Sequence, residues 1–178
     1  MNSIYLGNRE FIPFLSISEI ETTVQSLADQ INCDYIELNP LFIAVLNGSF
    51  IFAADLVKKI QAPCQISFVK LASYQKTERA NHVQQLLGLD TPIQNRHIVI
   101  LEDIVETGNT MDTLLSEINK QNPASVKICT LLFKPTKFTK SFPLAYIGKS
   151  IADAFVVGYG FDYDGYGRNL PCIYKIKQ

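Results

Sequence analysis

The 178-residue sequence predicts a single α/β domain in which helices flank a parallel β-sheet. Between residues 41 and 133, apolar runs of strand length alternate with stretches whose apolar residues recur at helical spacing, and this alternation is typical of parallel sheets. Hydrophobic residues make up 47% of the chain and charged residues 19%, a balance that supports a buried core and argues against intrinsic disorder. The length fits one domain, spanning residues 1–178.

The first predicted element is a helix over residues 16–32. Ser16 with Glu19, or Ser18 with Glu21, has the spacing of a capping box, in which the two side chains satisfy exposed N–H groups at a helix start. Strands and helices then alternate along the chain. The predicted strands cover residues 41–46, 64–70, 97–101 and 126–133, and the predicted helices cover residues 50–60 and 110–120.

Residues 71–86 differ from their neighbours because they are polar and show no periodicity, which in a small domain is more often functional or mobile than accidental. Near the C-terminus the chain is rich in Pro, Gly and Tyr, and residues 155–157 and 172–177 are predicted as short strands. Ligands of parallel sheets bind at the carboxyl ends of the strands. Loops 47–49, 71–86 and 102–110 are therefore expected to share one rim.

Charge and composition narrow the class of partner. The formal net charge is −1, so the overall charge of the chain does not favour binding to nucleic acid or to a membrane surface. The N-terminus lacks a basic secretory leader, and no apolar run approaches the ~20 residues that cross a bilayer. The four cysteines are scattered and there are only two histidines, which makes a histidine-based metal cluster implausible. We therefore expect a cytoplasmic protein.

The most informative stretch is residues 97–110, where a buried strand runs into Glu102-Asp103 and a loop with Thr107-Gly108 opens a helix. Exposed N–H groups at a helix start bind phosphate, and ionised carboxylates accept hydrogen bonds from sugar hydroxyls. Together they indicate a ribose phosphate. The alternative is that the carboxylates are solvated charges at a strand end and that Thr-Gly is merely a turn.

The whole arrangement resembles the motif with which type I phosphoribosyltransferases bind 5-phosphoribosyl diphosphate (PRPP). Further segments resemble the branch of that family that acts on 6-oxopurines, the hypoxanthine-guanine phosphoribosyltransferases. These segments are residues 46–56, 73–74, 130–134, 155–163 and 168–171. The resemblance implies a parallel sheet flanked by helices, with a core of about residues 35–140 and a small hood from about residues 1–15 and 141–178.

The resemblance also implies the residues that hold PRPP. Glu102 and Asp103 would bind the ribose hydroxyls. The 5′-phosphate would be held by the loop and helix start, which comprise Glu106, Thr107, Gly108, Asn109 and Thr110. The pyrophosphate group would be held by Asn47, Gly48 and Arg168. A Mg²⁺ ion would neutralise the leaving group, with Asp162 nearby and Glu102 and Asp103 as further candidate ligands.

On the purine side, the resemblance implies that Lys134 donates to the 6-oxo group, while Phe155 stacks on the base and the Val156 carbonyl accepts from its edge. Asp162 also belongs to this side. Glu106 would handle the proton at purine N7 as general acid or base. Ser73 and Tyr74 would lie in a catalytic loop of about residues 72–85 that is mobile in the free enzyme and closes over the substrates.

Two residues depart from the family pattern. The family usually has Asp where this chain has Glu106, whose side chain is one methylene longer, and commonly Lys where it has Asn47. The first change puts the reach of the proton-handling group in question, and the second removes a cation near the leaving group. The same loop leads us to predict a cis peptide bond between Leu46 and Asn47.

The sequence thus favours an enzyme of purine salvage that makes IMP or GMP and pyrophosphate from PRPP and hypoxanthine or guanine. One alternative is a PRPP-sensing regulatory protein of the same fold, but such a protein should carry a basic surface or an added domain. Another is a xanthine-preferring phosphoribosyltransferase; Lys134 argues only against adenine. The resemblance further implies a homodimer or homotetramer.

Overall fold

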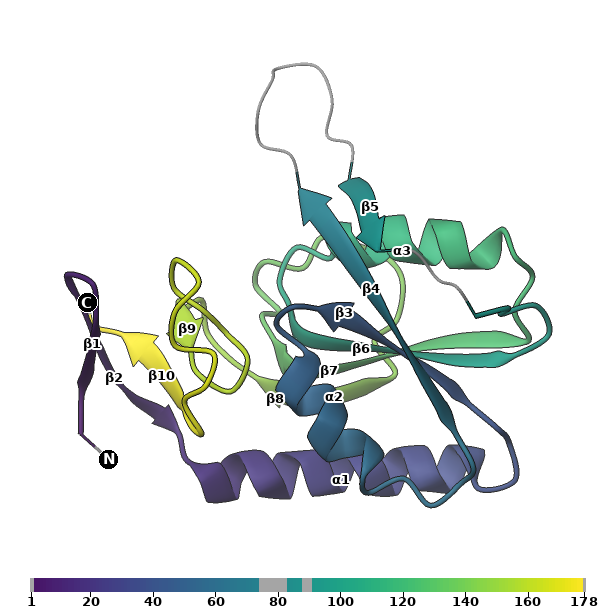
Figure 1. The fold of residues 1–178 in the computed structure, drawn as a ribbon, viewed down its shortest axis with the longest axis horizontal. Coiled ribbons are helices and arrows are strands. Elements are labelled where there is room, and N and C mark those ends of the chain that lie inside the picture. The colour runs from purple at the N-terminus through teal and green to yellow at the C-terminus, as the bar shows by residue number, and fades with distance from the viewer. Residues whose placement is uncertain (1, 74–82, 88–90, 178) are drawn as a thin grey trace.

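The computed structural model describes residues 2–73, 83–87 and 91–177, which form two sheets and three helices (Figure 1). The large sheet contains β3 (Leu41–Leu46), β4 (Gln65–Ser73), β5 (Val83–Leu87), β6 (His97–Val105), β7 (Ser125–Phe133) and β8 (Tyr146–Ser150). Its strand order is β5-β4-β3-β6-β7-β8, and all neighbours are parallel except β5, which runs antiparallel to β4. The predicted α/β fold is confirmed.

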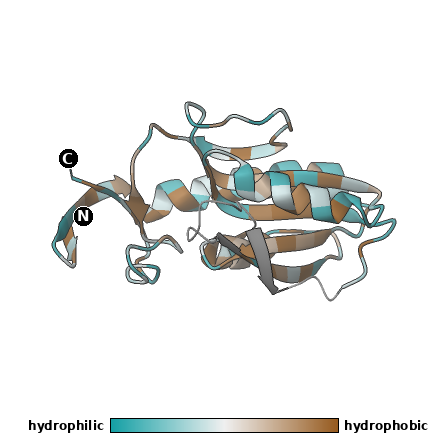
Figure 2. Ribbon diagram, turned by 90° about the horizontal axis from the view of Figure 1, so that it is seen from above, coloured by the Kyte–Doolittle hydropathy of each residue, from teal (hydrophilic) through white to brown (hydrophobic). Residues whose placement is uncertain are grey.

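Helices cover both faces of this sheet (Figure 1). Helices α1 (Ile17–Tyr35) and α2 (Phe50–Val57) pack on one face, where α1 buries an apolar stripe that includes Ile20, Val24 and Leu27. Helix α3 (Asn109–Asn119) packs on the other face. In Figure 2 the strands are mostly hydrophobic, whereas the helices alternate between hydrophilic and hydrophobic residues. Among the described residues, no helix is both long and apolar enough to cross a membrane.

The start of α1 decides between the two predicted capping boxes. Ser16 is the N-cap: its Oγ accepts from Glu19 N at 3.2 Å, and Glu19 Oε2 accepts from Ser16 N at 2.9 Å. The Ser18–Glu21 alternative is wrong. Carboxylate contacts with the Ser16 backbone and side chain lower the pKa of Glu19 to about 2.

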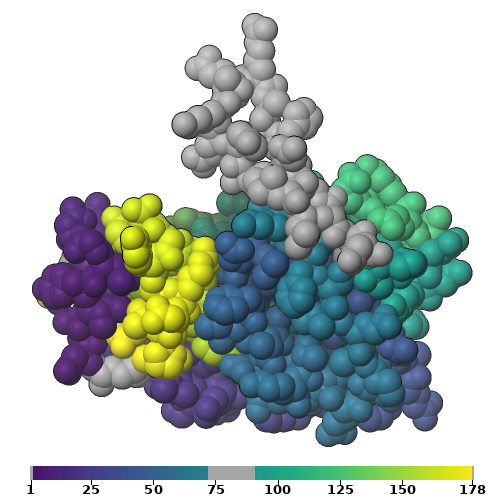
Figure 3. Space-filling model, viewed as in Figure 1, coloured from purple at the N-terminus to yellow at the C-terminus, as the bar shows by residue number. Residues whose placement is uncertain are grey.

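The small sheet joins the two ends of the chain. It contains β1 (Ile4–Leu6), β2 (Arg9–Leu15), β9 (Val156–Val157) and β10 (Ile173–Ile176), in the order β1-β2-β10-β9. Figure 3 shows the N-terminal residues in purple beside the C-terminal residues in yellow. The sequence predicted none of β1, β2, β5 and β8 as strands, and β5 covers the end of residues 71–86, which were expected to form a loop. The strand β8 pairs with β7 and so belongs to the large sheet. The C-terminal part of the small sheet therefore begins after β8, later than the residue 141 at which the hood was expected to begin.

Candidate active site

The carboxyl ends of the parallel strands bring the predicted motifs to one rim. Asn47 and Gly48 follow β3, Glu102 and Asp103 lie near the end of β6, and Lys134 follows β7. The strand β6 is four residues longer than predicted, so the two carboxylates stand within it rather than after it. Pairing of Glu102 with Thr130 and of Ile104 with Leu132 extends the strand past the acidic pair.

The acidic pair is buried. Glu102 and Asp103 are only 8% and 9% exposed, which rules out solvated strand-end charges. Oε2 of Glu102 has no hydrogen-bond partner among the described residues, while Oδ1 of Asp103 accepts from the Ile104 N–H at 2.8 Å. Burial raises the pKa of both carboxyls, and the neighbouring Asp103 charge raises that of Glu102 further. The pair therefore favours a ligand that brings hydroxyl donors or positive charge.

Glycines allow three segments to meet beside the acidic pair. A Cβ on Gly48 would lie 1.7 Å from Oδ2 of Asp103, and one on Gly160 would lie 2.1 Å from the Gly48 carbonyl oxygen. No larger residue fits at either position without displacement. The Leu46–Asn47 peptide bond in the same loop is cis, which confirms the prediction.

The C-terminal segment adds a cation and a third carboxylate to this corner. Arg168 Nη1 donates to the Gly160 carbonyl at 2.6 Å, and Nη2 lies 2.5 Å from Oδ1 of Asp162. The other oxygen of Asp162 accepts from the Gly165 N–H at 2.8 Å. The Arg168 charge acts on Asp103, where it opposes the rise in pKa that burial causes. Arg168 therefore links Asp162, by an ion pair, and Asp103, by its charge.

These carboxylates match the needs of Mg²⁺ better than those of a metal held entirely by protein. Within the described ranges, no group of three or more His, Cys, Asp or Glu side chains forms a ready metal cage. Mg²⁺ commonly uses one or two carboxylates and takes its other ligands from water and substrate phosphates. The unpartnered Oε2 of buried Glu102 is consistent with a cation or donor supplied by a ligand.

The predicted phosphate loop lines a cavity of about 270 Å³ together with the acidic pair. The lining runs from Glu102 to Met111 without a break. Gly108 is the N-cap of α3 at φ +85° and offers no side chain to cap the helix, and Thr107 Oγ1 accepts from the Asn109 N–H only at 3.4 Å. The first N–H groups of α3 therefore carry the partial positive charge that favours a phosphate.

Lys134 contacts Glu106, which lines this cavity. The Lys134 side chain is 4% exposed, and its Nζ lies 2.7 Å from Oε1 of Glu106 and 3.2 Å from Oδ1 of Asp153. Lys137 Nζ lies 2.9 Å from Oδ1 of Asp153 and 3.5 Å from Oε2 of Glu106. We call these four residues the lysine–carboxylate ring, because each ammonium contacts both carboxylates.

An exposed aromatic ring lies in the same C-terminal segment. Phe155 is 47% exposed just before β9, with its ring edge-on to Tyr163 at a centroid distance of 6.0 Å and tilted against Phe11 at 6.3 Å. A rigidly supported, exposed ring suits stacking on a flat base. The next residue, Val156, is buried in β9.

Sequence reasoning missed two residues of this site, Asp153 and Lys137. Both are single charged residues in segments without periodicity, so no local pattern marked them. Asp153 stands two residues before Phe155, which was the one available signal. Of the predicted catalytic loop, Ser73 is the last residue of β4, whereas Tyr74 and residues 75–82 lie outside the described residues.

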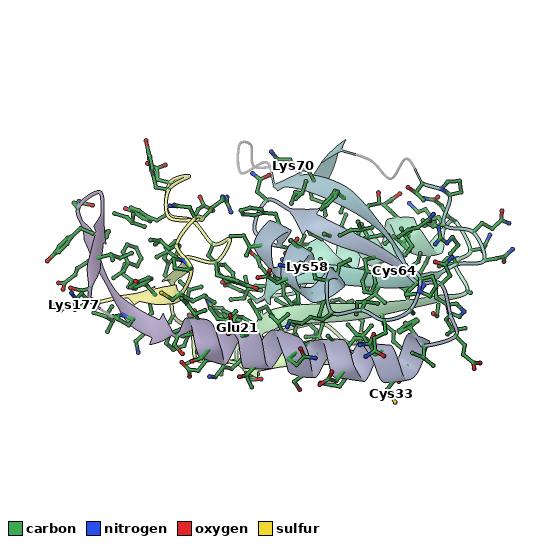
Figure 4. The ribbon with its side chains drawn as sticks, turned by 60° about the horizontal axis from the view of Figure 1, so that its bottom comes forward. Glu21, Cys33, Lys58, Cys64, Lys70 and Lys177 are labelled. Atoms are coloured by element: carbon green, nitrogen blue, oxygen red, sulfur yellow. The ribbon has the colours of Figure 1, made fainter. Side chains whose placement is uncertain are left out.

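A larger cavity of about 550 Å³ lies between α1, α2 and residues 169–171. Two of its lining residues, Glu21 on α1 and Lys58 just after α2, are labelled in Figure 4. Tyr159 forms part of its wall and donates to Oδ2 of Asp55 at 2.8 Å. None of the predicted site residues that the structure describes lines it.

Comparison with known proteins agrees with this geometry. Residues 14–164 match the model of the phosphoribosyl transferase domain. The chain is 38% identical over 166 residues to the hypoxanthine phosphoribosyltransferase of Haemophilus influenzae, covering 91% of this chain and 93% of that protein. The chain belongs to the phosphoribosyltransferase family. The hypoxanthine-guanine phosphoribosyltransferase of Mycobacterium bovis is 37% identical, with 96% of this chain and 87% of that protein covered.

Solved structures place this phosphoribosyltransferase in the same branch. The crystal structure of a hypoxanthine-guanine phosphoribosyltransferase from Bacillus anthracis superposes with a TM-score of 0.88 at 36% identity, covering 93% of this chain and 98% of that one. A hypoxanthine phosphoribosyltransferase from Staphylococcus aureus also gives a TM-score of 0.88, at 34% identity, with coverage of 93% and 90%. The chain is thus an enzyme of the glycosyltransferase type.

Proposed function

We propose that this enzyme transfers the 5-phosphoribosyl group of PRPP to hypoxanthine or guanine, giving IMP or GMP and pyrophosphate. The observation that carries the proposal is the 2.7 Å contact between buried Lys134 and Glu106 beside the phosphate cavity. This contact places the Lys134 ammonium, a hydrogen-bond donor for the 6-oxo group of a purine, beside the Glu106 carboxylate, an acceptor for a proton of the purine ring. The relatives from Haemophilus and Mycobacterium, whose names state these bases, support the same substrate class.

On the PRPP side, Glu102 and Asp103 accept from the ribose hydroxyls, and residues 106–110 hold the 5′-phosphate at the start of α3. Arg168 and the Asn47-Gly48 loop bind the pyrophosphate. The planar guanidinium of Arg168 suits phosphate oxygens, and its contacts with Gly160 and Asp162 support it in place.

We also propose Mg²⁺ as the cofactor, held by Asp162 with Glu102 and Asp103 as further ligands. When bound, Mg²⁺ neutralises the charge of the pyrophosphate leaving group. Removing divalent ions with EDTA should abolish turnover, and adding excess Mg²⁺ should restore it. Full turnover in EDTA would contradict the proposed cofactor but not the proposed substrates.

On the purine side, Phe155 stacks on the base, the Val156 carbonyl accepts from its edge, and Lys134 donates to the 6-oxo group. A 6-amino purine presents a donor to the Lys134 ammonium, so adenine is rejected. Glu106 takes or returns the proton at N7. Ser73, at the end of β4, and Tyr74, the next residue in the sequence, complete the proposed catalytic residues.

The enzyme is further proposed to act as a homodimer or homotetramer. Ile66 and Phe68 on β4 are each 38% exposed on the sheet face that α1 and α2 cover elsewhere, and Phe50 at the start of α2 is 42% exposed. A second copy of the chain would bury this apolar edge. Sedimentation of Phe68→Lys against wild type tests it: the variant should be smaller, and an unchanged mass would exclude this surface.

One assay tests the function. PRPP and Mg²⁺ are supplied with hypoxanthine, guanine, xanthine or adenine in parallel, and nucleotide formation is followed. We expect turnover with hypoxanthine or guanine and none with adenine. Turnover mainly with xanthine would shift the base preference within the class. PRPP binding without any nucleotide formed would instead support the regulatory protein and overturn the enzyme proposal.

A further inference from the structure

Lys137 and Asp153 stand beside the purine residues without a role in the transfer reaction proposed above. Their ion pair closes the lysine–carboxylate ring, and both side chains remain partly exposed, at 38% and 51%. The ring has two lysines and two carboxylates, so its formal charges cancel. The Lys137 N–H donates to the Lys134 carbonyl at 3.1 Å, a turn that brings the two lysines together.

The ring fixes how Lys134 can present its donors. An ammonium has three N–H donors, and contacts with Glu106 and Asp153 use two of them. The third remains for a ligand, and two fixed carboxylates determine where it points. Without Asp153, only Glu106 would orient Lys134, and any movement of Glu106 would move Lys134 as well.

Lys137 does the same for Glu106. Oε1 of Glu106 faces Lys134 and Oε2 faces Lys137, so the two ammoniums hold the carboxylate from both sides. Each carboxylate oxygen has about two acceptor positions, so Glu106 can still receive a proton or hydrogen bond from a base. The Glu side chain has one rotatable bond more than Asp, and the second contact restricts that added freedom.

We infer that Lys137 and Asp153 are a positioning pair for the purine site, which hold Lys134 and Glu106 in the arrangement that a 6-oxopurine requires. This inference rests on the proposed function. It assigns no contact with the substrates to either residue: Asp153 acts through Lys134, and Lys137 acts through Glu106 and Asp153.

The test compares five proteins: wild type, Lys137→Met, Lys137→Arg, Asp153→Asn and the double variant Lys137→Met/Asp153→Asn. In Lys137→Met we expect the KM for hypoxanthine to rise about threefold to tenfold, as expected for loss of a charged contact, with the KM for PRPP unchanged. Lys137→Arg should restore most of the loss because it keeps the cation. The double variant should be no worse than the poorer single variant, because both changes break the same pair.

Two further measurements separate positioning from other causes. The Kd of IMP should rise in Lys137→Met by the same factor as the KM for hypoxanthine, while the Kd of ribose 5-phosphate stays constant. Lys120→Met is the matched control, because it breaks an exposed pair with Glu117 at 2.6 Å on α3 and should leave all constants unchanged.

Three results would overturn the inference: a hypoxanthine KM within twofold of wild type in Lys137→Met, an equal rise in the KM for PRPP, or multiplicative effects in the double variant. Failure of the proposed function is recognised separately, because wild type itself would then form no IMP.

Discussion

Two groups of carboxylates share one rim of the sheet but differ in what neutralises them. Glu102 and Asp103 are almost fully buried and their pKa values are raised, and within the part of the chain that the structure describes Oε2 of Glu102 has no hydrogen-bond partner. Glu106 and Asp153 are about 40–50% exposed, and both are paired with lysines. Contact with Lys137 and Lys134 lowers the pKa of Asp153, and contact with Asp153 raises the pKa of Lys137.

The difference separates two kinds of binding site. A buried, unpaired carboxylate costs stability unless a ligand supplies donors or a cation, so the acidic pair is suited to a ligand with hydroxyls and bound metal. The lysine–carboxylate ring satisfies itself, so a ligand there must use the donors and acceptors that remain. The acidic pair therefore depends on its ligand for hydrogen-bond donors or positive charge, whereas the side chains of the lysine–carboxylate ring already pair with one another.

The largest expected effect comes from removing the cation at the centre of the ring. Lys134→Met should lower kcat/KM for hypoxanthine about 100-fold, because it removes a charged hydrogen bond to the base and the main support of Glu106. Steady-state kinetics measure it. The control is Lys127→Met at the opposite end of β7, where Lys127 pairs with Asp34 at 2.7 Å. That variant should lose stability and keep its kinetics; a similar kinetic loss there would show that Lys134 acts only through the fold.

A smaller effect is expected at Glu106. Glu106→Gln keeps the size but removes the base, so turnover with saturating PRPP should fall about 10-fold or more. Glu106→Asp should lose less, since it keeps the carboxylate and gives up only reach. Near-wild-type turnover in Glu106→Gln would show that this residue does not handle the proton.

The smallest effects are on stability, and they should have opposite signs in the two groups. Burial raises the pKa of Glu102 above its ordinary 4.5, so the native state binds more protons than the unfolded chain. Wild-type stability then falls as pH rises from 4.5 toward the raised pKa, and Glu102→Gln should gain on wild type over that window.

Asp153 behaves in the opposite way. Its lowered pKa contributes stability that is present above its ordinary 3.8 and is lost as pH falls through the lowered value. Asp153→Asn should therefore be less stable than wild type at neutral pH, and the difference should close in acid. Urea unfolding of both variants in EDTA, from pH 3 to 8, measures this. Curves that shift in the same direction would contradict the contrast between the two groups.

Much of the fold could be predicted because the pattern is local. The continuous apolar run of β3 and the capping box of α1 each lie within a few residues. The strand β8 could not be predicted, since its sequence Tyr-Ile-Gly-Lys-Ser contains neither an apolar run nor an alternation of apolar and polar residues. The hairpin of β1 and β2 was missed although Gly7-Asn8 marks its turn, because Pro13 in β2 disfavours a strand.

The site too has a part that the sequence predicts locally and a part that depends on contacts between distant segments. Residues 102–110 form one continuous motif, and their shared cavity follows from one strand, one loop and one helix. The contact of Lys137 with Glu106 and that of Asp153 with Lys134 join residues that are 31 and 19 positions apart, and both depend on how the loops after β7 and β8 fold back. Side chains from such loops carry no periodic signal, so only the structure brings them together.

The central claim is that the acidic pair binds PRPP and the lysine–carboxylate ring binds the purine. The most direct test compares how variants of the two groups change the KM for each substrate. The KM for PRPP and the KM for hypoxanthine are measured for wild type, Glu102→Gln/Asp103→Asn and Lys134→Met under identical Mg²⁺ concentrations. The account predicts that the first variant raises the KM for PRPP about 10-fold or more and leaves that for hypoxanthine within twofold, and that the second does the reverse. If both variants raise the same constant, the division of the rim between ribose phosphate and purine is wrong.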